Sequence, residues 1–226
     1  MGAKISKEVL DFFKELKGNN NREWFTENKK RFKALEADVK AFYTAIHENL
    51  NQHDDIDKMK LFRIYRDVRF SKDKTPYKTH FGGSFHRSKP RLRGGYYLHI
   101  ASGDSFLAAG FWEPNPADLM RIRKEFELDS EPMRNILADK QFSNTWGGLV
   151  GDEAKTAPKG FNREDPNIDL IRKQQFIFTK KFSDKELTAD DFLLKIDESF
   201  RAIRPYFDYM SEVLTTDLNG VSLIKD

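Results

Sequence analysis

The sequence contains no cysteine among its 226 residues. This absence excludes disulfide bonds, metal sites built on thiolates and a cysteine nucleophile. The chain also lacks any apolar run near the roughly eighteen residues that a membrane span requires. Its first residues, MGAKISKEVLDFF, lack the apolar stretch of a secretory signal peptide. We therefore expect a cytoplasmic protein that is not inserted in a membrane.

Familiar catalytic and cofactor motifs are missing as well. The sequence has no P-loop, no dinucleotide-binding glycine pattern and no GxSxG elbow, and no RRM, KH or helix-turn-helix pattern is recognisable. Its five histidines show neither HxH nor HExxH spacing. The sequence therefore predicts no cofactor and no metal site. Spacing leaves open only a metal site assembled in space from Asp67, Asp73, His80 and His99.

Positive charge is concentrated in one stretch, from Lys60 to Arg93. This stretch holds eleven Lys and Arg residues against two acids, a net charge of +9. The remainder carries 28 basic and 34 acidic residues, so the modest total of +3 conceals a strongly polarised chain. A concentrated positive field attracts phosphates, nucleic acid or acidic protein surfaces. The alternative interpretation of such a stretch is a solvated basic loop.

The first part of this stretch, residues 61–70, alternates between apolar and polar side chains and predicts a half-buried strand. Arg66 is the exception, because it falls on the apolar face. It must either form an ion pair with a carboxylate or reach a ligand through a gap in the sheet. Asp67 is expected to pair with a neighbouring arginine and is also considered as a catalytic residue.

Residues 71–80 predict a loop of defined shape, because Pro76 fixes its own φ and biases Thr75 towards extended backbone. Lysine ammonium groups and hydroxyl donors alternate along this loop, a composition that suits a phosphate or a carboxylate. The candidate ligand-binding residues of the whole stretch are Arg63, Arg66, Arg69, Lys72, Lys74, Tyr77 and Lys78.

The segment RDVRFSKDKTPYK, residues 66–78, resembles the signature of a widespread microbial family of unknown function, number twenty-four sixty-one. Supporting matches run along most of the chain: Asn20-Asn21 with Trp24-Phe25, Tyr96-Tyr97-Leu98-His99-Ile100, Pro158-Lys159-Gly160-Phe161 and Asp165-Pro166. The resemblance implies an α+β domain. It carries over no catalytic residue, because the family has no established activity.

Periodicity along the rest of the chain predicts the same α+β class, with a mainly antiparallel sheet covered by N- and C-terminal amphipathic helices. We expect strands at 61–70, 96–101, 105–111 and 175–182, and a polar, mobile segment at 84–95. The helical residues 1–52, a sheet-containing core at 60–182 and the C-terminal helices at 188–216 are expected to form a single domain over 1–226.

Three functions fit these features. The first is a cytoplasmic protein that binds an anionic, phosphate-bearing ligand, either a small molecule or a nucleic-acid backbone. The second is an enzyme acting on a phosphate- or carboxylate-bearing substrate, in which His99 or His80 moves a proton while arginines stabilise developing charge. The third is a structural or partner-binding protein whose basic motif is an internal ion-pair network. His99 is the best general acid or base if it shares a face with Arg63 and Arg69.

Overall fold

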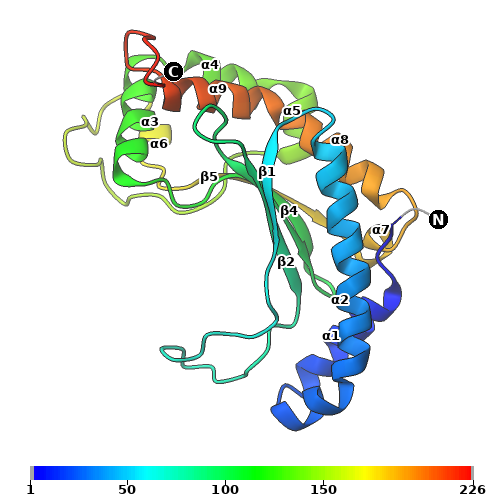
Figure 1. Ribbon diagram of the computed structural model, residues 1–226. Coiled ribbons are helices and arrows are strands. Elements are labelled where there is room, and N and C mark those ends of the chain that lie inside the picture. Colours follow the sequence, from blue (N-terminus) through cyan, green and yellow to red (C-terminus); the bar gives the residue numbers. More distant parts are fainter. Residues whose placement is uncertain (1–2, 225–226) are drawn as a thin grey trace. The chain divides into compact units, whose positions relative to one another are not determined.

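A computed structural model of the chain describes residues 3–224. It contains a five-stranded antiparallel sheet in the order β1-β2-β3-β4-β5, so strands adjacent in sequence are adjacent in the sheet (Figure 1). The strands are β1 (Ile56–Leu61), β2 (Phe81–Arg87), β3 (Gly95–Ile100), β4 (Ser105–Phe111) and β5 (Phe176–Phe182). Together with helices near both ends of the chain, this sheet confirms the predicted α+β class.

Several helices begin where the sequence supplies a cap or a proline. The Asn21 side chain accepts a hydrogen bond from the Trp24 amide (2.9 Å), and Pro116 and Pro205 stand in the first turns of their helices, where proline is tolerated. The helices are α1 (Lys7–Gly18), α2 (Arg22–Leu50), α3 (Pro116–Leu128), α4 (Glu131–Ala138), α5 (Lys140–Trp146), α6 (Ile168–Ile171), α7 (Asp184–Leu187), α8 (Phe192–Ala202) and α9 (Arg204–Thr215).

The chain divides into two compact units, each assembled from separate segments. The first unit comprises the described residues up to Phe85 together with Tyr97–Leu107 and Lys181–Glu198. The second comprises His86–Tyr96, Ala108–Lys180 and the described residues from Ser199 onward. The single domain expected over 1–226 stays a prediction.

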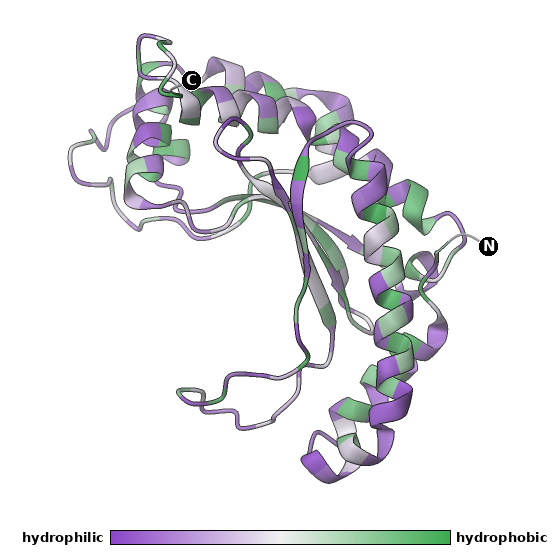
Figure 2. Cartoon of the chain, in the orientation of Figure 1, coloured by the Kyte–Doolittle hydropathy of each residue, from purple (hydrophilic) through white to green (hydrophobic). Residues whose placement is uncertain are grey.

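In the first unit, α1 and α2 cover one face of the sheet through aromatic side chains. The rings of Phe13 and Phe32 contact the ring of Phe81 on β2, and Tyr43 stacks on Phe85 of the same strand. These core residues recur along α2 at helical spacing, and Figure 2 shows hydrophobic and hydrophilic segments alternating along that helix. Because side chains alternate across a strand, the intervening residues of β2 face away from these helices.

The second unit buries a cation of the basic stretch. Arg87 is fully buried, and its guanidinium donates to the Phe207 carbonyl (3.3 Å) and to Ser211 Oγ (3.1 Å). Arg93 pairs with Asp118. A buried charge is tolerated only when it is paired and hydrogen-bonded, as these two arginines are. Both arginines are therefore engaged inside the second unit.

The predicted strand at 61–70 is wrong. β1 ends at Leu61, and residues 62–80 form a long loop between β1 and β2. The alternation was misleading because Ile64 is buried whereas Phe70, of the same parity, is 96% exposed. β2 itself overlaps the segment expected to be polar and mobile from residue 84 onward. The strands predicted at 96–101, 105–111 and 175–182 match β3, β4 and β5 to within one residue.

Candidate functional site

We call residues 62–80, which join β1 to β2, the basic loop. Its two arms pair with each other: the Lys78 amide donates to the Ile64 carbonyl (2.8 Å), and the Arg66 amide donates to the Pro76 carbonyl (2.9 Å). An isolated bridge joins Tyr65 to Tyr77. Figure 1 shows the loop extending beyond the ends of the two strands. This pairing gives the loop a defined shape, although it forms no continuous strand.

A residue 57 positions earlier in the chain anchors the basic loop. The Asn20 side chain donates to the Tyr77 carbonyl (2.9 Å) and accepts from the Tyr77 amide (3.1 Å), as a neighbouring strand would. The Tyr77 ring stacks on Phe25 of α2, with 4.0 Å between ring centroids, and is only 6% exposed. Burial raises the pKa of the Tyr77 hydroxyl. Tyr77 therefore holds the loop to the helices.

Arg66 forms an ion pair inside the loop, which was the first of the two interpretations of this residue. Its Nη1 pairs with Asp73 Oδ2 and donates to the Thr75 carbonyl (3.1 Å). Asp73 Oδ1 in turn accepts from the amide (2.9 Å) and the hydroxyl (2.8 Å) of Thr75. These Thr75 donors, with Arg66, lower the pKa of the Asp73 carboxyl to about 2. The arginine, the aspartate and the threonine together close the tip of the loop.

Other predicted ligand residues are also engaged within the loop. Arg69 pairs with Asp67 (2.7 Å) and thereby lowers the pKa of that carboxyl, as expected from their spacing. The Lys74 ammonium donates to the Val68 carbonyl (3.0 Å). Lys72 is exposed. Asp67, which was considered as a catalytic residue, is thus half-exposed and occupied by Arg69.

Within residues 3–224, Lys60, Arg63 and Lys78 have no carboxylate within ion-pairing distance. Two of them converge on one aromatic ring: the ammonium groups of Lys60 and Lys78 lie 5.3 Å and 5.6 Å from the centroid of Phe62. Burial and the nearby charge of Arg63 lower the pKa of Lys78. These three residues, named the cation cluster, therefore concentrate positive charge that no carboxylate of residues 3–224 pairs with.

Next to the cation cluster lies a group of partly exposed rings, named the ring face: Phe62, His80, Tyr97, His99 and Phe106. On β3, Leu98 and Ile100 are fully buried, so Tyr97 and His99 point to the opposite side of the sheet. On β2, Gly82 leaves room for the Tyr97 ring, since a Cβ at Gly82 would lie 2.5 Å from Tyr97 Oη. The ring face therefore lies on the side of the sheet that α1 and α2 leave uncovered.

Two histidines meet within the ring face. The rings of His80 and His99 have centroids 4.1 Å apart, and the Tyr97 hydroxyl lies 3.1 Å from His99 Nδ1. Burial, with the adjacent His99 and Lys78, lowers the pKa of His80 to about 4. Burial also lowers the pKa of His99. Both shifts favour the neutral imidazole, beside cations that no carboxylate of residues 3–224 pairs with.

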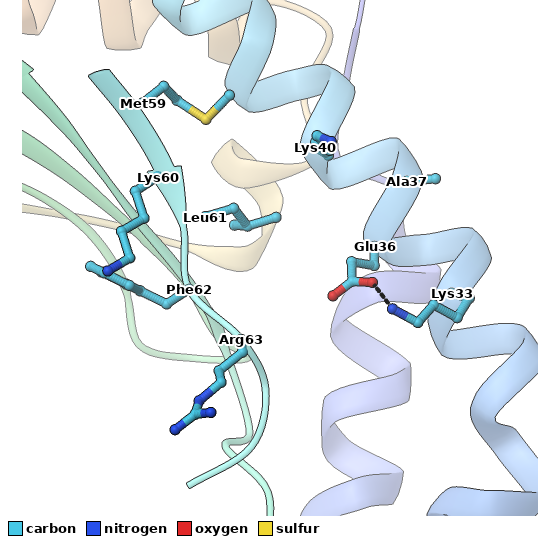
Figure 3. A pocket seen from close by; sticks show the side chains of 9 residues that line it. All are labelled: Lys33, Glu36, Ala37, Lys40, Met59, Lys60, Leu61, Phe62 and Arg63. Atoms are coloured by element: carbon cyan, nitrogen blue, oxygen red, sulfur yellow. Dashed lines mark hydrogen bonds and ion pairs between the residues drawn. The ribbon is translucent and has the colours of Figure 1, made fainter. Parts of the chain in front are cut away.

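A groove of about 590 Å³ between α2 and β1 shares Lys60, Phe62 and Arg63 with the candidate site. Figure 3 shows Met59 and Leu61 pointing into it, towards α2, whereas Lys60, Phe62 and Arg63 point away. On the helix side, Lys33 is already paired with Glu36 (2.5 Å). The groove therefore has an apolar floor, and only part of the charge on its rim is paired. Lys78 and the two histidines do not line the groove, so we place the candidate site on the other side of β1, towards which Lys60, Phe62 and Arg63 point.

Residues 3–224 form neither a metal cluster nor a membrane-spanning helix. Between residues 3 and 224, no three His, Cys, Asp or Glu side chains come together in a way that could hold a metal ion. None of the helices within the same residues is both long enough and apolar enough to cross a membrane.

The family model described as "Conserved hypothetical protein (DUF2461)" matches residues 8–209. The chain belongs to the DUF2461 family. This confirms the family membership predicted from the sequence. The match spans both compact units and all five strands of the DUF2461 chain. No curated protein and no solved structure matches it.

The structure of this DUF2461 member separates the predicted site residues into two groups. Arg63, Lys78, His80 and His99 lie in one connected region, because Lys78 acts on the pKa of His80 and Arg63 acts on that of Lys78. The residues engaged in or exposed on the basic loop, away from the histidines, are Arg66, Asp67, Arg69, Lys72, Lys74 and Tyr77.

Sequence reasoning missed part of the site. Lys60, Phe62, Tyr97 and Phe106 were not selected as ligand-binding residues. The alternation of β3 was a usable signal, because it already placed Tyr97 with His99 on one face. The contribution of Phe106 follows from the same hairpin, in which His99 and Phe106 stack with 4.7 Å between ring centroids. The position of Phe62 beside them depends on where β1 ends, which the alternation misplaced.

Proposed function

We propose that the cation cluster binds an anionic, phosphate-bearing ligand. The observation that carries this proposal is that Lys60 and Lys78 converge on the Phe62 ring, with Arg63 close to Lys78, and that none of the three has a carboxylate partner among the described residues. Burial and, after it, the nearby charge of Arg63 lower the pKa of Lys78, so both desolvation and like-charge repulsion act against its ammonium form. A phosphate placed among these cations would relieve the repulsion and form charge-assisted hydrogen bonds. A cytoplasmic location for this binding stays a prediction.

The internal ion-pair interpretation applies to a different set of residues. Arg66 and Arg69 each have a carboxylate partner inside the basic loop, so their role in this proposal is to position the loop. Asn20 and Tyr77 hold the same loop against α2. Arg63 and Lys78 sit on its two arms near the sheet, where the positions of their side chains depend on this internal network.

Isothermal titration with inorganic pyrophosphate at low ionic strength tests the proposal. We expect the Arg63→Ala/Lys78→Ala variant to bind at least about tenfold more weakly than wild type, because each charge-assisted hydrogen bond contributes about 1.5–3 kcal/mol. The matched control is Arg91→Ala/Lys159→Ala, which removes the same charge from exposed residues of the second unit. Equal weakening in both variants, or no binding by folded wild type, would contradict a site at the cation cluster.

Catalysis on a phosphate-bearing substrate is the second candidate, and the His80–His99 contact favours it. A neutral imidazole can accept a proton, and the Tyr97 hydroxyl fixes the orientation of the His99 ring. The check is release of inorganic phosphate from phosphate monoesters by wild type and by His99→Gln. Turnover that the variant loses, while its pyrophosphate affinity is unchanged, would support this candidate. Absence of turnover would leave the site as a binding site.

A further inference from the structure

We propose that the ligand is a single-stranded nucleic acid, with bases stacked on the ring face and backbone phosphates held by the cation cluster. This inference rests on the proposed phosphate binding and names its ligand class. It is carried by a second observation, the row of rings next to the cations. Proteins that bind single strands combine a positively charged edge with aromatic side chains on which successive bases stack.

The ring face is continuous across the sheet. Phe62 at the end of β1 lies 6.4 Å from Tyr97, and Tyr97 lies 5.8 Å from Phe106 on β4. His99 stacks on Phe106 and contacts His80. All five side chains are partly exposed. The rings thus extend from the loop after β1 over β3 to β4, a wider surface than one phosphorylated metabolite needs and suited to more than one base.

The shape of the sheet keeps this surface accessible. Gly82 has no side chain beneath the Tyr97 ring, so the ring packs directly against the backbone of β2. The Tyr97 hydroxyl is held by His99 Nδ1, which limits the motion of both rings. Rigid aromatic contacts lose little conformational entropy when a base stacks on them.

The positions of charge and rings favour a single strand over a duplex. The cation cluster flanks Phe62, at the β1 end of the ring face, where both ammonium groups already contact an aromatic ring. A duplex keeps its bases stacked on one another and offers only phosphates and groove edges to a protein. Unpaired bases are free to stack on side chains while their phosphates follow the charged edge.

Fluorescence anisotropy with 5′-labelled twelve-nucleotide oligouridine and oligothymidine, together with a labelled duplex of the same length, tests the inference. We expect wild type to bind the single strands more tightly than the duplex, whichever of the RNA and the DNA it prefers. Replacing Tyr97 and Phe106 by leucine keeps apolar volume but removes two stacking surfaces. This double variant should bind single strands about ten- to a hundredfold more weakly, by the usual contribution of base stacking, and pyrophosphate as wild type does.

Three controls keep the two proposals apart. Phe70→Leu removes an aromatic ring from the exposed tip of the basic loop and should leave oligonucleotide affinity unchanged. Phe106→Leu alone, at the β4 end of the ring face and away from the cation cluster, serves if the double variant loses its thermal transition. Arg63→Ala/Lys78→Ala should weaken both ligands and reduce the slope of log K against log salt by about 1.4, since each phosphate contact on a single strand contributes about 0.7.

The possible outcomes distinguish the two proposals. Pyrophosphate binding at the cation cluster without preference for single strands would overturn the nucleic-acid inference and leave the phosphate site standing. Oligonucleotide binding that the leucine variants retain at wild-type strength would overturn it as well. Failure of wild type to bind either ligand would overturn both proposals.

Discussion

Arg63 and Arg66 stand three positions apart in one loop, yet their surroundings give them different roles. Arg66 has Asp73 and Thr75 within reach, so its charge is used to close the loop. Arg63 has no carboxylate within ion-pairing distance among residues 3–224, so its charge is available to a ligand. The identity of a residue predicts what it can bind, and its neighbours decide whether that capacity is already used.

His80 gives a prediction about stability and pH. The folded state lowers its pKa from 6.5 to about 4, through burial and through the adjacent His99 and Lys78. Well above pH 6.5 the imidazole is neutral in both states. Between pH 6.5 and 4 the unfolded chain binds a proton that the folded chain excludes, so the free energy of unfolding falls as the pH falls.

The variant His80→Gln keeps a polar side chain but removes this titration. Because the ring is partly exposed and screened by solvent, we expect a modest effect: from pH 7 to pH 4.5 the variant should lose about 1 kcal/mol less stability than wild type. Urea denaturation at the two pH values measures this difference. The same pH dependence in both proteins would mean that His80 is protonated as readily in the folded state as in the unfolded chain.

At the scale of elements, the basic loop depends on a contact that no local pattern reveals. Asn20 bonds both the amide and the carbonyl of Tyr77, and the adjacent Asn21 caps α2. We expect Asn20→Ala to lower the free energy of unfolding by about 1–3 kcal/mol, because two backbone groups beside a buried ring lose their partner. Asn19→Ala is the matched control, since the exposed Asn19 side chain bonds only the nearby Glu15 carbonyl (2.9 Å).

Chemical denaturation of the two asparagine variants gives the comparison, and pyrophosphate affinity adds a second measurement. If Asn20 positions the loop, Asn20→Ala should also weaken binding at the cation cluster. Equal stability of the Asn20→Ala and Asn19→Ala proteins would show that solvent replaces Asn20 at Tyr77 without loss.

The same elements show which parts of the structure were predictable. Strands β3, β4 and β5 have apolar alternation bounded by turn residues, and all three were located to within one residue. The loop after β1 also alternates, but its arms pair with each other over a short span, so the alternation does not mark a strand. His99 was selected from its strand, whereas its contact with His80 depends on the long-range pairing of β2 with β3. Local pattern predicts elements, and pairing between distant segments builds the site.

At the scale of the whole molecule, the positive charge of the basic stretch is divided among several roles. The stretch from Lys60 to Arg93 is strongly basic, but Arg87 and Arg93 are engaged within the second unit while Arg66 and Arg69 pair within the loop. Only part of the charge therefore remains for a ligand. A net charge predicts the sign of a partner, and its distribution over ion pairs decides where that partner binds.

Connectivity gives the last prediction, which concerns the single domain expected over 1–226. Each compact unit is assembled from three separate segments, and β2, β3, β4 and β5 each contribute residues to both units. Neither unit can keep its strands intact if the other unfolds, because the backbone of the same strand belongs to both. We therefore expect one cooperative thermal transition, in which the calorimetric enthalpy equals the van't Hoff enthalpy.

Differential scanning calorimetry measures both enthalpies, with far-ultraviolet circular dichroism as the second probe. Two resolved transitions, or Asn20→Ala shifting only a part of the unfolding curve, would show instead that the units unfold independently.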